Sequence, residues 1–384
     1  MPNRYTTNLS QNELPLSISS EVTIISSNKD LQSINRFTNN HTEGLSGNKL
    51  SNLLNVYDLW PRFVRGYNTE FSLANAPKKT AVYRQLTERI GNTSYEGTLK
   101  ITPAILTWES ADKGDTLAYP SDREENVESA LISLASQGKL FKLKNNKQTN
   151  SSSNYAVHFT IIELIKELKS VNKSLSNPEV KKALNILKGS ELMFKYQTID
   201  SEGNVHERES KMNYLSSIHF SSTRGRGDVK CIAVFNEFMT KQIESLEYRG
   251  YYFNRSMQFR RALARWLSKR LYQIFRYANQ GSNYHFTLIK MMVKYGAINQ
   301  EDTPVSSNKL PAIRRDMTNA IKDLIKANII EEYTIERIKV DGICIDYKYT
   351  IKASSDFANE ILALNRHRKK LNTKTTKQIE KKEL

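Results

Sequence analysis

Residues 259–278 read FRRALARWLSKRLYQIFRYA, and this stretch decides the fold of the last third of the chain. Its apolar residues recur three and four positions apart, which predicts one long amphipathic helix. Basic residues project to the opposite side of the helical wheel, at Arg261, Arg265, Lys269 and Arg276. Between Glu247 and Glu301 the chain has ten lysines and arginines, twelve aromatic residues and no acidic residue. A folded surface without acids favours a polyanion as partner, DNA above all.

The net charge of the chain is concentrated in the same region. The whole sequence has 57 Lys+Arg against 40 Asp+Glu, a formal charge of +17 and a pI near 9.6. Residues 248–384 alone hold 27 basic and 13 acidic side chains. An ordinary soluble protein of high pI would spread its charge, so the distribution indicates one module that binds a polyanion.

A length of 384 residues and 39% hydrophobic content predict two or three ordinary globular domains. Cys231 and Cys344 lie in apolar, strand-like surroundings, which favours buried thiols over a disulfide or a zinc site. There is neither an apolar run of about 18 residues nor a charged-then-apolar leader, so we expect a cytoplasmic protein without a membrane partner.

The first 250 residues are expected to contain an arm and one domain. Residues 1–50 are rich in Asn, Ser and Thr and are predicted to be a disordered arm with a short strand at 22–25. The domain at 51–250 is predicted to be a winged helix with an appended β-sheet. Its expected elements are helices at 81–90, 104–108, 121–138 and 178–188, a hairpin at 140–143 and 155–161, and strands at 191–197, 216–222 and 230–235.

The same order of elements recurs at 251–358. After the helix at 259–278, the pattern predicts helices at 287–294 and 309–327 and a hairpin that turns at Asp341-Gly342. Residues 359–384 are expected to be a basic tail. The fold class predicted is therefore α+β, with two winged-helix domains in tandem.

In a helix-turn-helix protein the second helix of the motif enters the major groove of DNA. For the domain at 251–358 this helix is 309–327, where Arg315 and Asn319 are the candidates for reading bases. The candidates for phosphate contacts are Lys309, Arg314, Lys322 and Lys326 on the helix. In the wing, a backbone contact could come from Arg337, Lys339 or Lys348, of which Lys348 is the preferred candidate. The alternative is a solvated helix face without a partner.

Two further groups of basic residues are candidates for phosphate contacts. Arg261, Arg265, Lys269 and Arg276 could follow the DNA backbone, or could simply be an exposed helix face. Arg224 and Arg226 lie in a glycine-containing loop that permits close approach of a phosphate, and a plain hairpin tip is an equal alternative.

The domain at 51–250 is less suited to DNA. Its predicted recognition helix carries several acids that would repel phosphate, namely Asp122, Glu124, Glu125 and Glu128. Either this helix contacts another protein, or only its N-terminus and the wing lysines Lys142, Lys144 and Lys147 approach DNA. In both cases we expect the two domains to have different roles.

Catalysis is not expected. The six histidines form no H-x-H pair for a metal-dependent nickase and no H-x-x-R motif of a tyrosine recombinase. No P-loop is present, so no nucleotide cofactor is expected, and scattered acids predict no metal site. Tyr248, Tyr251 and Tyr252 are interpreted as packing or stacking aromatics rather than nicking residues.

Residues 254–272, NRSMQFRRALARWLSKRLY, together with the helix and hairpin up to Ile351, resemble the bacterial plasmid replication initiators built from two tandem winged-helix domains. The resemblance covers about residues 80–355. It implies binding to repeated origin sites (iterons) in double-stranded DNA, opening of the origin, recruitment of the host helicase and DnaA, and a role in copy control. It also implies repression of its own promoter and a homodimer in equilibrium with a monomer, with the first winged domain as dimer interface.

Two other classes of protein fit the same residues. A winged-helix transcriptional regulator or phage repressor would use the same domains on a palindromic site. A DNA-nicking enzyme is the second alternative, and it lacks recognisable catalytic residues in this sequence.

Overall fold

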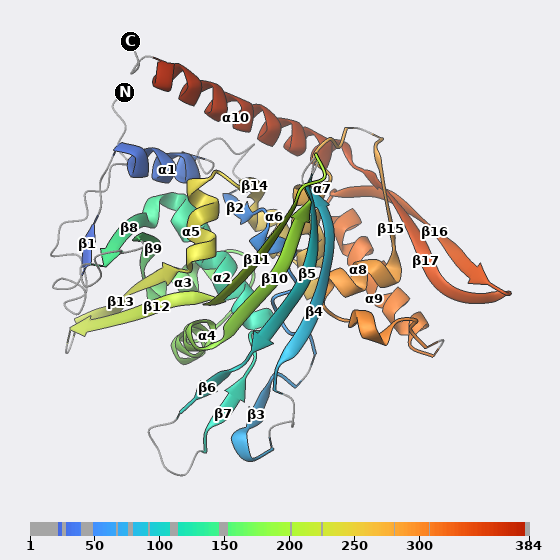
Figure 1. Ribbon diagram of the computed structural model, residues 1–384, viewed down its shortest axis with the longest axis horizontal. Helices are drawn as coiled ribbons and strands as arrows, with labels where there is room; N and C mark the ends of the chain where they lie inside the picture. Colours follow the sequence, from blue (N-terminus) through green and yellow to red (C-terminus); the bar gives the residue numbers. More distant parts are fainter. Residues whose placement is uncertain are drawn as a thin grey trace. The chain divides into compact units, whose positions relative to one another are not determined.

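The structure is a computed structural model that describes residues 22–24, 28–39, 49–66, 68–75, 80–90, 93–107, 114–145, 153–199, 202–223, 226–279, 281–306 and 308–380 (Figure 1). The chain divides into two compact units. The first unit comprises residues 1–39 and 54–248, and the second comprises residues 40–53 and 249–384.

The first unit contains a five-stranded antiparallel sheet in the order β1-β8-β9-β13-β12. Its strands are β1 (Val22–Ile24), β8 (Leu140–Asn145), β9 (Ser153–Thr160), β12 (Leu215–Thr223) and β13 (Arg226–Phe235). The predicted hairpin is confirmed, because β8 pairs with β9. Some apolar residues of these strands join a large core that also contains Leu131, Leu164 and Leu184 from three helices, and others form a separate cluster around Phe141 and Ile232.

A second antiparallel sheet of this unit has the order β11-β10-β5-β4. Its strands are β4 (Val82–Ile90), β5 (Thr93–Thr102), β10 (Glu191–Ile199) and β11 (Val205–Asn213). A small third sheet joins β3 (Glu70–Ser72), β7 (Thr116–Ala118) and β6 (Ala104–Leu106).

Two predicted helices of the first unit are wrong, because 82–90 is β4 and 104–106 is β6. In β4 the buried side chains alternate at Arg84, Leu86 and Glu88, which is the period of a strand. Two of these three are charged, so the alternation is invisible to a count of apolar residues. The predicted order of three helices and a hairpin is therefore absent from the described part of 81–161.

The helices of the first unit are α1 (Asn28–Asn39), α2 (Asp122–Leu134), α3 (Ile161–Lys169), α4 (Asn177–Gly189) and α5 (Glu237–Glu244), with a short 3₁₀ turn at Tyr57–Leu59. Capping boxes begin α2, α3 and α4 and fix where these helices start. Gly138 has a φ of +92°, as a residue that ends a helix often does. The strand β1 agrees with the short strand predicted at 22–25, and the helix α1 corrects the prediction of disorder for residues 28–39.

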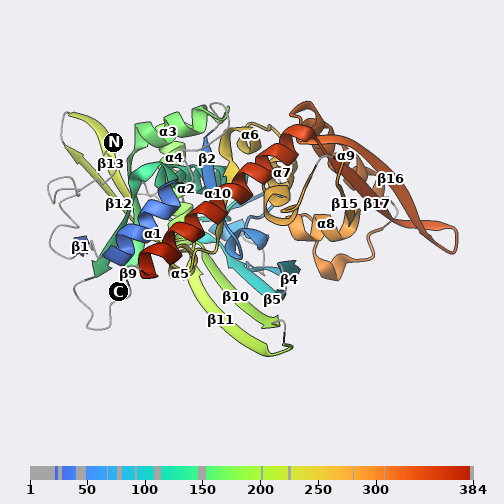
Figure 2. The same cartoon turned by 90° about the horizontal axis from the view of Figure 1, so that it is seen from above.

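The second unit contains α6 (Phe253–Met257), α7 (Ala262–Ile274), α8 (Leu288–Tyr295), α9 (Leu310–Lys326) and α10 (Ser355–Glu380). Its sheets are the pair β2 (Leu50–Leu54) and β14 (Tyr248–Tyr252), and a three-stranded sheet in the order β15-β17-β16. The latter consists of β15 (Asn283–Thr287), β16 (Ile330–Val340) and β17 (Ile343–Ala353). Figure 2 shows these elements from above.

The predicted helices and hairpin of this unit are confirmed, with two corrections. Gly296 ends α8 in the left-handed conformation at φ +83°, and the hairpin turns at Asp341 and Gly342, both with positive φ. The helix predicted at 259–278 is shorter in the structure, where α7 spans Ala262–Ile274. Most of the expected basic tail is instead the helix α10, whose Ile361 is fully buried.

No helix in the described ranges is both long enough and apolar enough to cross a membrane. Of the two cysteines, Cys231 is buried, and burial raises the pKa of its thiol to about 12. Cys344 in β17 is only half-buried, so the prediction of two buried thiols is correct for one of them.

Candidate nucleic-acid interface

The helix α9 is held in the second unit by a continuous apolar face. Leu310, Met317, Ala320, Ile321 and Leu324 are all buried, at three- and four-residue spacing. These contacts fix which side of the helix faces solvent. The apolar spacing within 309–327 predicts a buried face of Ile313, Met317, Ala320, Ile321 and Leu324. The structure differs in that Ile313 is half-buried and Leu310 is buried.

The C-terminal end of α9 is bound by an arginine from α6. The Arg255 guanidinium donates to the carbonyl oxygens of Ala327, at 2.7 and 3.2 Å, and of Asn328, at 2.5 Å. A cation at this end of a helix is favourable because the last carbonyls carry partial negative charge. Arg255 also forms an ion pair with the buried carboxylate of Glu360 in α10. Arg255 belongs to the stretch between Glu247 and Glu301 that has no acidic residue. It therefore stabilises the fold and does not bind a ligand.

The opposite face of α9 carries unneutralised basic side chains. Arg315, Lys322 and Lys326 are exposed, and Asn319 between them is half-buried. Lys309, just before the helix, is exposed as well. In the part of the chain that the structure describes, Arg315, Lys322 and Lys326 form no hydrogen bond or ion pair, so their charge is available to an external anion.

Arg314 lies between α9 and the hairpin. Its guanidinium lies over the ring of Tyr347, 5.1 Å from the centroid, and is half-buried. Next to it, the Tyr349 hydroxyl lies 3.1 Å from Thr318 Oγ1 and donates to the Arg314 carbonyl oxygen at 3.3 Å. Burial raises the pKa of Tyr349, which keeps the hydroxyl protonated. These contacts fix the hairpin against α9.

The hairpin β16–β17 exposes its own cations. Arg337 and Lys339 are exposed, whereas Lys348 is half-buried and lies 3.6 Å from a carboxylate oxygen of Glu336. Lys348, the residue favoured from the sequence, is thus the most neutralised of the three. Arg337 and Lys339 are the better placed of the three to meet a phosphate.

The predicted basic stripe on α7 is largely wrong. Every residue from Leu263 to Gln273 is buried, so α7 is a central helix without a solvent face. Arg265 is 3% exposed and donates to the carbonyl oxygens of Phe259 and Arg260, and Lys269 is buried as well. A helical wheel assumes that polar residues face water, and here they are enclosed by other elements.

The remaining two residues of the stripe are also engaged. Arg261 is exposed but forms an ion pair with Asp323 of α9, in which its Nη1 donates to both carboxylate oxygens at 2.7 and 2.9 Å. Arg276 is half-buried and donates to the carbonyl oxygen of Gln273.

In the first unit, Arg224 lies outside the described residues, and Arg226 begins β13.

The acidic helix α2 does not present its acids to a partner. Glu124, Glu125 and Glu128 are buried, with exposed fractions of at most 3%. The expectation of an acidic contact face is therefore wrong. Glu125 and Glu128 are neutralised by Arg65 and Arg62, about 60 positions earlier in the chain, a spacing that no local pattern reveals, whereas Glu124 pairs with the adjacent Arg123.

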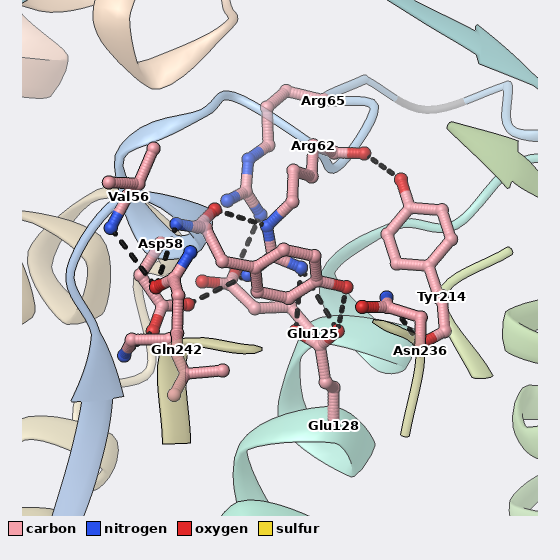
Figure 3. Close-up of polar contacts among 11 residues, drawn as sticks. Val56, Asp58, Arg62, Arg65, Glu125, Glu128, Tyr214, Asn236 and Gln242 are labelled. Carbon is pink, nitrogen blue, oxygen red and sulfur yellow. Dashed lines mark hydrogen bonds and ion pairs between the residues drawn. The ribbon is translucent and has the colours of Figure 1, made fainter. Parts of the chain in front are cut away.

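Figure 3 shows the centre of this ion network in the first unit. Arg62 forms hydrogen bonds of 2.8 and 3.0 Å to the two oxygens of Glu128 and one of 2.7 Å to Asp58. The Tyr57 hydroxyl donates to Glu128 at 2.9 Å, and Arg65 pairs with Glu125 at 2.7 Å. Burial raises the pKa of Glu128 and Arg62 opposes this effect. The network fixes α2 against the segment that follows β2.

Among the described residues, no group of three or more His, Cys, Asp and Glu side chains could hold a metal ion.

No known protein family and no curated protein matches the chain. It is similar to two structures of domains 2 and 3 of RctB, at 12% identity and TM-scores of 0.40 and 0.39. These matches cover 72% and 75% of this chain and 94% and 97% of the RctB chains. It is also similar to the Pi initiator protein in complex with iteron DNA, at 13% identity and a TM-score of 0.35, over 52% of this chain and 82% of that chain. An initiator protein in complex with iteron DNA is thus among the solved structures to which the chain is similar.

Proposed function

We propose that the second unit is a winged-helix domain that binds double-stranded DNA, with α9 in the major groove and β16–β17 as the wing. The observation that carries this proposal is the face of α9. On this face, Arg315, Lys322 and Lys326 are exposed and have no protein partner in the described part of the chain. By contrast, Arg255 and Arg265 donate hydrogen bonds to backbone carbonyl oxygens within the fold. Free cations on a rigid helix of this width suit the major groove.

The side chains differ in the contact that they can make. Arg315 can bind guanine with two hydrogen bonds, and Asn319 can bind adenine in the same way. The lysines at 309, 322 and 326 reach phosphates on either side, and Arg314 does so from the edge of the wing. Arg337 and Lys339 extend the phosphate contacts along the hairpin. Arg265 and Lys269 have no part in this proposal.

For the whole protein we propose a plasmid replication initiator that binds repeated origin sites. The resemblance of residues 254–272 to such initiators supports the assignment, as does the concentration of positive charge after residue 247. Origin opening, recruitment of a helicase and DnaA, control of its own promoter, and a dimer–monomer equilibrium through the first unit belong to the same proposal. The protein would act in the cytoplasm and without catalysis of its own.

The test of DNA binding compares two α9 variants with a control on duplex DNA from the region around the gene, where the proposal expects direct repeats. Arg315→Ala should cost about 1–3 kcal/mol and relax sequence preference, because it removes a base contact. Lys322→Ala should weaken all sequences alike and reduce the salt slope by about one. Lys230→Ala removes an exposed charge from the first unit and should bind like the parent. If both α9 variants also bind like the parent, the assignment of α9 is wrong.

Footprinting separates the initiator from its alternatives. Protection of several direct repeats is expected, whereas protection of a single palindrome would indicate a repressor. Incubation of the protein with supercoiled plasmid and Mg²⁺ should leave the plasmid uncut. Nicked circles would contradict the proposal of a protein without catalysis.

A further inference from the structure

Three arginines of the second unit gather around one asparagine. Arg249 in β14 donates from Nη2 to Asn365 Oδ1 at 2.9 Å, and Asn365 Nδ2 donates to the carbonyl oxygen of Arg276 at 2.8 Å. Arg368 lies one turn after Asn365 on α10, whose beginning lies beside α7 in Figure 2. The three guanidinium groups come from distant parts of the sequence and are brought together only by the fold.

Arg249 is the buried member of this cluster. It is 4% exposed, its Nε has no hydrogen-bond partner, and no acidic residue among the described residues pairs with it. Burial and the guanidinium groups of Arg276 and Arg368 lower its pKa to about 10, and Tyr277 acts in the opposite direction. A buried cation among like charges is costly, and a bound anion would offset this cost. Arg276 and Arg368 are half-buried, so an anion can reach them from solvent.

Tyr277 gives this site a second chemical character. Its side chain is 90% exposed, far more than any other large hydrophobic side chain among the described residues; Ile343 follows at 64%. It directly follows Arg276 and lies near enough to Arg249 to influence it electrostatically. An aromatic ring in solvent beside cations is the arrangement on which an unpaired base stacks while its phosphate is bound.

We propose that Arg249, Arg276, Arg368 and Tyr277 bind an unpaired nucleotide of single-stranded DNA, with its phosphate at the arginines and its base on the tyrosine ring. A base within a duplex is stacked between its neighbours and cannot reach the ring, so the site selects single strands. This site is separate from the exposed face of α9 and does not depend on duplex recognition there.

The experiment measures binding of a fluorescently labelled oligothymidylate to the full chain by anisotropy. Tyr277→Ala should weaken binding about 5- to 150-fold, the effect of losing one stacked base. Tyr277→Phe keeps the ring and should bind like the parent. Because Tyr277 is almost fully exposed, neither variant should change the unfolding temperature. Equal binding by parent, Tyr277→Ala and Tyr277→Phe would overturn the proposal.

The arginines are tested with a matched pair on α10. Arg368→Gln should weaken oligothymidylate binding, whereas Arg366→Gln removes the same charge from an exposed position two residues away and should have a much smaller effect. Equal losses would show nonspecific attraction and refute the site. Thymidine monophosphate should compete only weakly; competition at concentrations equal to the oligonucleotide's nucleotide content would overturn the assignment to a DNA strand. Duplex binding by Tyr277→Ala should be unchanged, so this test and that of α9 can fail independently.

Discussion

Replacement of Glu128 by alanine is expected to destabilise the first unit strongly. The carboxylate is 2% exposed and accepts two hydrogen bonds from Arg62 and one from Tyr57. Removal of this carboxylate leaves Asp58 as the remaining ion-pair partner of the buried Arg62 (Figure 3). Breaking a buried ion pair by removing one partner costs about 3–5 kcal/mol. Because Asp58 remains, we expect the lower end, about 3 kcal/mol, which lowers the melting temperature of a unit of this size by about 6–12 °C.

Differential scanning calorimetry of the full chain measures this shift, with the transition of the second unit as internal reference. Glu237→Ala is the control, since its ion pair with Lys241 is exposed on both sides and should contribute less than about 1 kcal/mol. Replacing both Arg62 by Met and Glu128 by Leu should restore part of the loss, because the buried Arg62 charge is removed together with that of Glu128, whereas Asp58 loses its ion pair with Arg62. A shift for Glu128→Ala as small as that of the control would refute this reasoning.

Three further predictions concern other charged contacts. Asp323→Asn releases Arg261 beside α9, so duplex DNA should bind more tightly and the salt slope should steepen by about one; unchanged anisotropy titrations would contradict this. Arg255→Met removes the cation at the end of α9 and leaves Glu360 unpaired, so calorimetry should show the second unit destabilised by about 3 kcal/mol. Burial raises the pKa of Glu70, but hydrogen bonds from Lys182 and Arg123 lower it overall. The first unit should therefore lose stability as the pH falls through this lowered pKa, and Glu70→Gln should flatten that dependence in thermal melts.

The second unit could be predicted from the sequence because its signals are local. The apolar spacing from Met317 to Leu324 fixes the buried face of α9, Gly296 ends α8, and Asp341-Gly342 supplies the turn of the hairpin. The exposure of Arg315, Lys322 and Lys326 follows from the same spacing. This part of the candidate site was therefore accessible without coordinates.

Several of the errors share one physical cause, which is charge buried by partners distant in sequence. Arg84 and Glu88 hide the alternation of β4, and Arg265 and Lys269 are enclosed in a helix that has no solvent face. Glu128 is matched by an arginine 66 residues away. Prediction from sequence patterns assumes that charged residues lie on the surface, whereas in this chain several of them are buried. The sequence does not predict the strand β15, because only two of its five residues are apolar.

The contacts of Arg255 also define how the DNA-binding part could be isolated. A fragment that ended with the wing at Ala353 would contain the whole of α9 and β17, yet it would lack Glu360 and leave Arg255 without its counter-ion. Phe357, which packs on Tyr272 and Phe275, would be lost as well. The smallest fragment that folds by itself should therefore extend through the first three turns of α10. A protease that cuts earlier in that helix would abolish DNA binding by α9, although the cut lies outside α9.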